Sequence, residues 1–241
     1  TEIYTLSLHD ALPIWRWALD RIRDLLFGVV LRGHTPPIDI QFRPLETGIF
    51  LDTDDFQVSA FPVYHRGPDC YGFLFQEKAR RPFLPEKAEA LRIPPGPWRR
   101  DLVTGQVVTL PDGRQILPDE GLGEERQGTR LVHVGDVGRT EDLLEVCQDA
   151  DVLVIESTYL EEEAEMARNF AHLTAKMAAR LALQANVKHL ILTHISRRYR
   201  ERDVIAEARE IFPGAIVARD FDDYQIKRGE LLKLEAGFHE S

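Results

Sequence analysis

The sequence predicts an α/β fold with a protruding arm, and three features support this prediction. From residue 130 onward, short apolar runs alternate with segments of helical periodicity. Such alternation is typical of a sheet with helices packed on it. Several His and acidic residues stand where apolar runs end, and residues 80–128 interrupt the pattern with many Pro, Gly and charged residues. We expect one domain over residues 15–241, with residues 80–128 as its arm.

The first fourteen residues, TEIYTLSLHDALPI, resemble over their whole length the forward translation of a sequencing-library adapter. We therefore expect residues 1–14 to be an artefact, with native sequence starting at Trp15 and a natural N-terminus that lies further upstream. The alternative is a native amphipathic segment, since Leu6, Leu8 and Leu12 are apolar. An independent sequence of the codons before Trp15 distinguishes the two.

A helix and two strands are predicted before the arm. Apolar residues recur at helical spacing from Trp15 to Phe27, which predicts a helix. The runs Phe56 to Tyr64 and Tyr71 to Gln76 are rich in aromatic and β-branched residues, and a turn-like segment separates them. We expect these two runs to be neighbouring strands.

The arm and the second half of the chain differ in composition and in hydrophobic periodicity. Within residues 80–128, the sequence Pro-Asp-Gly at 111–113 predicts a hairpin, and we expect little that could form a thick core. After the arm, strands are predicted at 130–134, 152–155, 189–193, and near residues 215 and 224. Helices are predicted at 141–148, 202–211, and 160–183 with a break near residue 171.

The composition of the chain excludes several classes of function. The 241 residues are 44% hydrophobic and 29% charged, as in ordinary globular proteins, and no apolar run approaches the ~20 residues of a membrane span. We therefore expect a cytoplasmic protein with no membrane partner. The two cysteines, Cys70 and Cys147, are far apart, which excludes a disulfide framework and a thiolate zinc site. A net charge of −10 argues against a general nucleic-acid coat but permits a local basic patch.

Three candidate metal ligands follow predicted strands: His65, Asp136 and His194. The carboxyl ends of strands in α/β sheets converge on one site, and imidazole with carboxylate suits a metal such as zinc. Each residue also has a structural interpretation, as a hydrogen-bonded histidine or a turn aspartate. Together they predict a His/Asp metal site.

Glu156 and His172 form a candidate acid–base pair. Glu156 follows an apolar strand, and His172 opens a helical segment. A carboxylate beside an imidazole can relay a proton. Helix capping explains either residue equally well.

Five segments of the sequence resemble those of a known protein family. They occur in this order: Gly-Asp at 135–136, ADVLVIESTY at 150–159, AHLTAKMAARLA at 171–182, LILTHISRRY at 190–199 and EAREIFPGAIVARDF at 207–221. With YHRGPDCYGFLFQE at 64–77 and ALRIPPGPWRRDLVTGQVVTLPDGRQI at 90–116, they resemble the C-terminal half of the ribonuclease Z family, tRNA 3′-processing endonucleases of the metallo-β-lactamase superfamily.

The resemblance implies a metallo-β-lactamase-type αβ/βα sandwich, incomplete at the N-terminus, that holds two Zn²⁺ ions. It implies that His65 and His194 are metal ligands and that Asp136 bridges the metals. It also implies that the Glu156–His172 pair orients the phosphate and protonates the leaving oxygen. The arm would grip precursor tRNA from the partner subunit of a homodimer.

Basic residues agree with an RNA partner. Residues 78–100 hold seven basic residues against two acidic ones, and we expect Arg99 and Arg100 of the arm to bind substrate. A solvated charged loop is the alternative. Arg197 and Arg198 follow His194 and would either contact phosphate near the metals or pair with nearby glutamates.

The sequence also departs from the family pattern. The motif H-x-H-x-D-H does not occur in the 241 residues, and we expect it upstream of Trp15. Ile155 and Val137 replace the family's usual His and Thr. The main hypothesis is a zinc-dependent endoribonuclease that removes 3′ trailers from precursor tRNA. The alternatives are a related hydrolase of a small phosphodiester, sulfate ester or lactone, and a catalytically inactive metal- or RNA-binding fragment. We expect the 241 residues alone to be inactive and prone to aggregate.

Overall fold

The computed structural model describes residues 16–34, 40–67, 70–227 and 229–234. The expectation about residues 1–14 lies outside the described residues. The main feature is a seven-stranded sheet of order β1-β2-β3-β6-β7-β8-β9. Its strands are β1 (Gly48–Asp52), β2 (Phe56–Pro62), β3 (Tyr71–Glu77), β6 (Arg130–Val134), β7 (Val152–Glu156), β8 (His189–Thr193) and β9 (Ile216–Val217).

The direction of the strands decides which ends meet. β3 pairs antiparallel with both β2 and β6, so β2 and β6 run the same way. β7 and β8 continue in parallel from β6. The carboxyl ends of β2, β6, β7 and β8 therefore lie along one edge of the sheet, where residues that follow these strands can converge.

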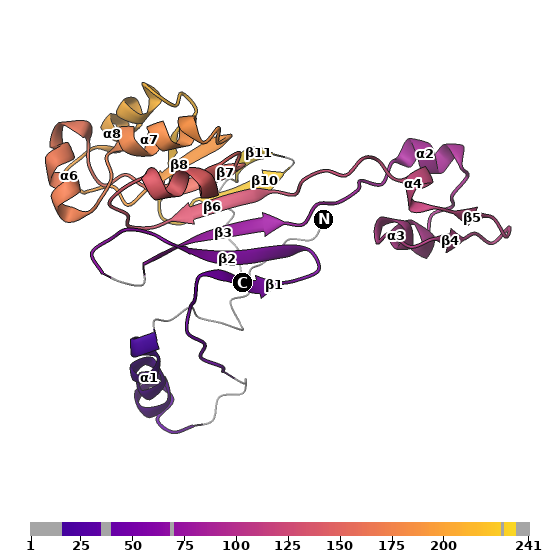
Figure 1. Ribbon diagram of the computed structural model, residues 1–241, viewed down its shortest axis with the longest axis horizontal. Helices are drawn as coiled ribbons and strands as arrows, with labels where there is room; N and C mark the ends of the chain where they lie inside the picture. Colours follow the sequence, from indigo (N-terminus) through magenta and orange to yellow (C-terminus); the bar gives the residue numbers. More distant parts are fainter. Residues whose placement is uncertain (1–15, 35–39, 68–69, 228, 235–241) are drawn as a thin grey trace.

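Helices cover one face of this sheet (Figure 1). They are the short helix α5 (Leu144–Cys147) with a preceding 3₁₀ turn at Glu141–Leu143, α6 (Ala164–Phe170) after a 3₁₀ turn at Glu161–Glu163, α7 (Ala175–Gln184) and α8 (Glu201–Arg209). Alternate strand residues such as Val132, Leu153 and Leu190 are fully buried beneath them. α7 buries four alanines, and these small side chains let the helix approach the sheet closely.

The opposite face of the sheet carries the alternate residues of the same strands. Leu131 and Val154 are half-buried there, and His133 is exposed. The expected αβ/βα sandwich consists of two sheets with helices on their outer faces, and the described residues supply one such layer. None of the helices in these described ranges has the length and apolar character that a membrane span requires.

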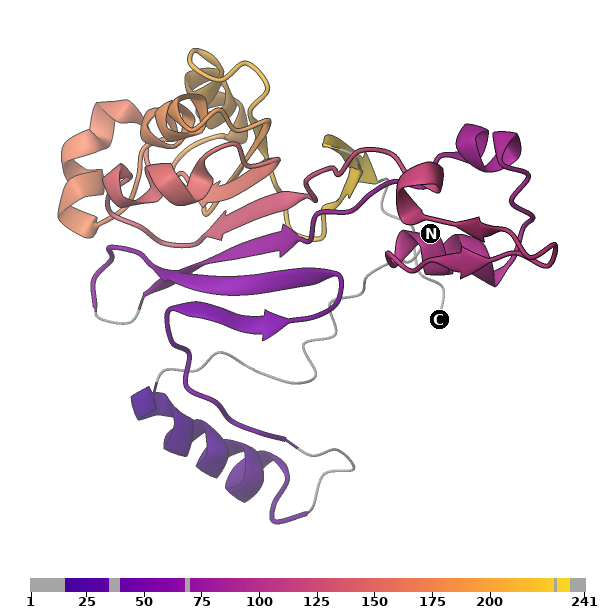
Figure 2. The ribbon, with the colours of Figure 1, turned by 45° about the vertical axis from the view of Figure 1, so that its right-hand side comes forward.

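The arm projects from the end of β3 and returns into β6 (Figures 1 and 2). It contains α2 (Pro85–Ala90), α3 (Pro97–Val103), the hairpin β4 (Val108–Thr109) and β5 (Gln115–Ile116), and α4 (Pro118–Gly121). The expectation of little core is wrong. Seven apolar residues are buried together: Ala88, Ile93, Leu102, Val108, Leu110, Ile116 and Leu122. Their spacing is irregular because short helices and turns, not long periodic elements, bring them together.

Most predicted elements are confirmed, with changes at their ends. The first helix is α1 (Arg16–Asp24), followed by a π-helical turn, η1 (Leu25–Val30). The predicted 160–183 helix breaks at Ala171, whose φ of 54° is left-handed. The predicted strand near residue 224 is β10 (Asp223–Lys227), which pairs with β11 (Glu230–Leu234) as a separate ribbon. β1, β11 and the arm helices were not predicted.

Candidate metal centre

The candidate centre lies at the edge where β2, β6, β7 and β8 end. His65 follows β2, Asp136 follows β6, Glu156 ends β7 and His194 follows β8. His172 comes from the turn between α6 and α7, which is held beside the end of β7 because Tyr159 N–H donates to Leu173 O and Tyr159 O accepts from Ala175 N–H. The fold thus brings together the five predicted metal and acid–base residues from positions up to 129 residues apart.

The three histidines stand side by side around Asp136. The ring centroids are 5.1 Å apart for His65 and His172, and 5.3 Å apart for His172 and His194. Oδ2 of Asp136 lies 3.8 Å from Nε2 of His65, and its Oδ1 lies 3.5 Å from Nδ1 of His194. One carboxylate is therefore shared between two imidazoles.

The Nδ1 atom of each histidine is held by the protein. Nδ1 of His65 lies 2.8 Å from the Ala171 carbonyl oxygen, and Nδ1 of His172 lies 2.8 Å from Oε1 of Glu156. Nδ1 of His194 lies 2.7 Å from the Thr158 hydroxyl. With Nδ1–H donating in each case, Nε2 keeps its lone pair. This is the tautomer that a metal-binding histidine needs.

Glu156 links the loops of the centre through hydrogen bonds. Its side chain is fully buried and accepts five hydrogen bonds: from the backbone N–H groups of Val137, Thr158 and Leu173, the hydroxyl of Thr158 and Nδ1 of His172. These donors come from the loops after β6 and β7 and from the turn before α7. Because its side chain is fully enclosed, Glu156 contacts the loops around it and is not exposed to solvent.

Two of the seven non-glycine residues with positive φ in the described structure lie at this centre. His194 has φ 53° and Ala171 has φ 54°, a left-handed conformation that costs energy for residues with a Cβ. Ala171 supplies the carbonyl that holds His65. Gly138 lies so close to Ala171 that an added Cβ would be 2.9 Å from the Ala171 Cα. The strained turn is thus fixed by contact with the loop that carries Asp136.

The donor set fits a metal such as zinc. One ligand atom from each of His65, Asp136 and His172 lies within 4.8 Å of the others, and the same holds for Glu156, His172 and His194. Imidazole nitrogens and carboxylate oxygens are zinc ligands, and no thiolate is present in either group. Burial raises the pKa of the Cys147 thiol to about 12, which keeps it protonated.

The four predicted substrate arginines lie in two places. Arg197 and Arg198 are exposed near the centre, and Arg198 is 2.8 Å from Glu163 and stands over the Tyr159 ring. Arg100 is exposed on the arm. Arg99 donates to the carbonyls of Ile93 and Pro94, so its guanidinium is engaged within the arm.

Sequence reasoning missed two positioning groups, the Thr158 hydroxyl and the Ala171 carbonyl. Thr158 stands two residues after Glu156, just beyond a buried strand, and this position was the available signal. The Ala171 group is a backbone carbonyl, so no residue type in the sequence identifies it. His189, interpreted as structural, lies 2.8 Å from the Gly229 carbonyl through Nε2 and is outside the cluster.

Comparisons with known proteins agree with this geometry. The sequence profile of the Beta-lactamase superfamily domain matches residues 121–195. The chain is 43% identical to the ribonuclease Z of Bradyrhizobium diazoefficiens and 46% identical to that of Bradyrhizobium sp. (strain ORS 278), each over 204 residues. Both matches cover 85% of this chain and 67% of the relative.

A solved structure shares the fold. The metallo-beta-lactamase fold protein YhfI from Bacillus subtilis superposes with a TM-score of 0.53 at 14% identity, over 93% of this chain and 64% of that one. The similarity of fold and the sequence identity over most of the chain point to the same group of proteins. The chain belongs to the ribonuclease Z family of the metallo-β-lactamase superfamily.

Proposed function

We propose that the protein is a zinc-dependent endoribonuclease that removes 3′ trailers from precursor tRNA. The observation that carries this proposal is the cluster of His65, Asp136, His172 and His194, in a chain more than 40% identical to two ribonucleases Z. We further propose two Zn²⁺ ions, a homodimer and a cytoplasmic location, as the sequence analysis expects.

His65, His194 and Asp136 would hold the metal ions. Zinc supplies a water nucleophile of lowered pKa and stabilises the negative charge that develops on a phosphodiester under attack. Asp136 lies between His65 and His194, so its two oxygens are placed to bind on both sides. Thr158 and the Ala171 carbonyl hold the two imidazoles with Nε2 directed away from the protein network.

His172 is the proposed proton donor. Its Nδ1 is held by Glu156, which leaves Nε2 to exchange a proton with the leaving oxygen. Arg197 and Arg198 lie at the same edge and are proposed to orient the phosphate, with Arg198 leaving Glu163 to do so. We propose residues 80–128 as a substrate-binding arm through Arg100, with Arg99 supporting its structure.

The test is cleavage of a tRNA with a 3′ extension by the protein expressed from its complete reading frame. The zinc-loaded protein is expected to release the trailer, and His172→Gln is expected to bind zinc normally but cleave at least 100-fold more slowly. Zinc binding without cleavage of the precursor, together with turnover of bis-p-nitrophenyl phosphate, would instead favour a hydrolase of small esters.

A further inference from the structure

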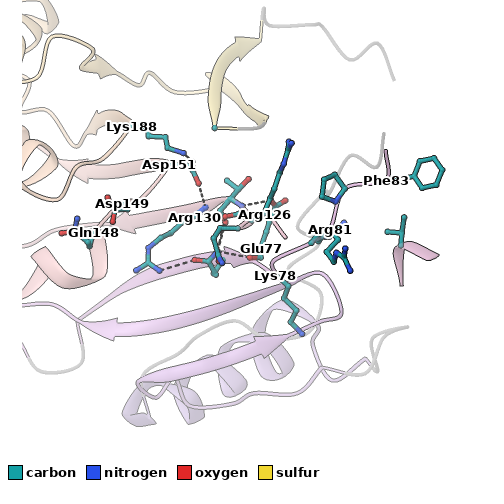
Figure 3. A pocket seen from close by; sticks show the side chains of 18 of the residues that line it. Glu77, Lys78, Arg81, Phe83, Arg126, Arg130, Gln148, Asp149, Asp151 and Lys188 are labelled. Atoms are coloured by element: carbon teal, nitrogen blue, oxygen red, sulfur yellow. Dashed lines mark hydrogen bonds and ion pairs between the residues drawn. The ribbon is translucent and has the colours of Figure 1, made fainter. Parts of the chain in front are cut away.

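A groove lies at the root of the arm. Here the structure has a groove of about 1120 Å³, which we call the root groove (Figure 3). It is lined by the end of β3, by both connections between sheet and arm, and by the residues that precede β7 and β8.

The root groove is at the far edge of the sheet from the metal ligands. Arg130 is the first residue of β6, Asp151 comes directly before β7 and Lys188 directly before β8. Asp136 and His194 follow the other ends of β6 and β8. Five-residue strands separate the two edges by roughly 16 Å. A molecule in the root groove is therefore remote from the cleavage chemistry.

The lining of the groove is positively charged. Six basic residues face three acidic ones, Glu77, Asp149 and Asp151. The basic residues are Lys78, Arg80, Arg81, Arg126, Arg130 and Lys188. The whole chain has a net charge of −10, so the lining residues reverse its sign, while Asp52, Asp55 and Asp119 just outside the lining pair with three of the six cations. A positive groove on an acidic protein attracts an anion selectively to that place.

Ion pairs engage four of these six cations. Arg81 pairs with Asp119, and Lys188 lies 2.6 Å from the buried Asp151, so those two are held. The other two pairs are exposed. Lys78 lies 2.8 Å from Asp52 and Arg80 lies 2.9 Å from Asp55, with each of the four side chains more than a third exposed. Exposed pairs contribute little free energy, so these cations can exchange a carboxylate for a phosphate at small cost.

Two arginines are not neutralised in this way. Arg126 is exposed and has no carboxylate within ion-pair distance among the described residues. Arg130 contacts neutral acceptors, the Gln76 side chain at 3.3 Å and the Val146 carbonyl at 2.8 Å, and its Nε is buried without a partner in the described part of the chain.

The backbone places one of these arginines beside another cation. Arg80 and Arg126 are directly opposite on the two antiparallel connections, and their backbone N–H and C=O groups exchange two hydrogen bonds of 2.9 Å. Like charges at such positions repel each other. Because Arg80 is already paired with Asp55, an anion bound between the connections would mainly neutralise Arg126.

We propose that the root groove binds the phosphodiester backbone of the RNA substrate, at a point remote from the metal centre. The inference rests on the proposed function for the identity of the ligand. Guanidinium groups match phosphate geometry, and a groove open to solvent suits a continuous backbone. Contact here and at the metal edge would fix the distance between the gripped part of the RNA and the cleaved bond.

The test measures RNA binding to the protein expressed from its complete reading frame. Fluorescence anisotropy with a 3′-extended tRNA in EDTA, over a series of salt concentrations, separates binding from cleavage. Arg126→Glu is expected to weaken binding about tenfold at 0.1 M salt and to lower the salt slope by about one. Arg126→Lys should largely retain binding. Arg180→Glu, the same reversal on the outer surface of α7, is the matched control and should leave binding unchanged.

A second pair of variants guards against misfolding. Gln127 is exposed and lines the groove, so Gln127→Arg is expected to tighten binding several-fold and Gln127→Glu to weaken it. Hydrolysis of bis-p-nitrophenyl phosphate with zinc should be the same in all variants, since this ester is too small to span both sites.

The outcomes separate the two proposals. If the precursor is cleaved and neither Arg126→Glu nor the Gln127 variants change its binding, the groove proposal is wrong and the proposed function stands. If Arg126→Glu abolishes RNA binding but wild-type protein with zinc leaves the bound precursor uncut, the groove proposal stands and the proposed function is wrong. If inorganic phosphate alone binds in an Arg126-dependent way while RNA binding is unaffected, the groove is a small-anion site and the RNA proposal is overturned.

Discussion

The metal-ligand edge of the sheet draws on residues between 65 and 194, whereas the core of the arm draws on residues 88 to 122 alone. At the metal edge, a buried carboxylate and several polar groups are joined by hydrogen bonds between distant loops. In the arm, the buried residues are apolar and their contacts are local.

The two regions should therefore respond differently to mutation. The metal edge forms only when the sheet has brought its loops together, so damage to one polar link spreads to ligands on other loops. The arm can lose its order while the sheet persists, because it joins the sheet only through two connections (Figure 2). Changes at the two places should therefore have separable effects on zinc binding and on RNA binding.

The largest effect is expected at Glu156. In Glu156→Gln an amide NH₂ replaces one carboxylate oxygen, and it meets N–H donors instead of acceptors. We expect a loss of about 3–5 kcal/mol in the free energy of unfolding, with loss of zinc binding. Urea denaturation and zinc titration measure both. Glu165→Gln, an exposed change in α6, is the control, and equal stability of the two variants would contradict the network.

The arm should respond next, and separately. Leu102 is fully buried in the arm core, so Leu102→Ala removes packing worth about 2–4 kcal/mol there. Amide hydrogen exchange should quicken in residues 85–122 and stay slow in β6 to β8. RNA binding should weaken, while zinc affinity stays at the wild-type value.

The matched change is Leu117→Ala, at a half-exposed arm position. It should leave exchange in the arm nearly unchanged. A fall in zinc affinity for Leu102→Ala would show that the arm and the metal edge fold as one unit and are not separable.

A smaller effect is expected where the loop after Asp136 meets Ala171. Gly138→Ala adds a Cβ 2.9 Å from the Ala171 Cα and 3.1 Å from the Tyr64 ring, so backbone must move. We expect a cost of about 1–3 kcal/mol and weaker zinc binding, since both His65 and Asp136 depend on this contact. Gly135→Ala, which meets nothing within 4 Å, is the control in the same loop. Equal zinc affinities would show that the contact does not position the ligands.

The same contrast explains how far the sequence could be interpreted. The strands 130–134 and 189–193 have continuous apolar runs, and their bounds are predicted to the residue. His65, Asp136 and His194 stand at strand ends, so strand direction alone predicts that they converge. The arm core was not predicted because the three arm helices are only four to seven residues long, too short for helical periodicity to show, and each begins with Pro. The root groove was not predicted because it forms between segments that lie far apart in the sequence and meet only in the folded sheet.

The smallest effect tests the link between Glu156 and His194. The Thr158 hydroxyl donates to Oε2 of Glu156 at 2.5 Å and accepts from Nδ1 of His194 at 2.7 Å. Thr158→Val keeps the shape but removes this link, so His194 can rotate or change tautomer. We expect about tenfold weaker zinc binding and a loss of only about 1 kcal/mol in stability. Thr158→Ser should restore affinity. Ser157→Ala removes a neighbouring buried hydroxyl that does not contact a histidine in the described structure, and it should bind zinc normally. If Thr158→Val and Ser157→Ala have the same zinc affinity, the tautomer of His194 is fixed by Asp136 and not by Thr158, and the ordering of the centre would depend on the shared carboxylate instead.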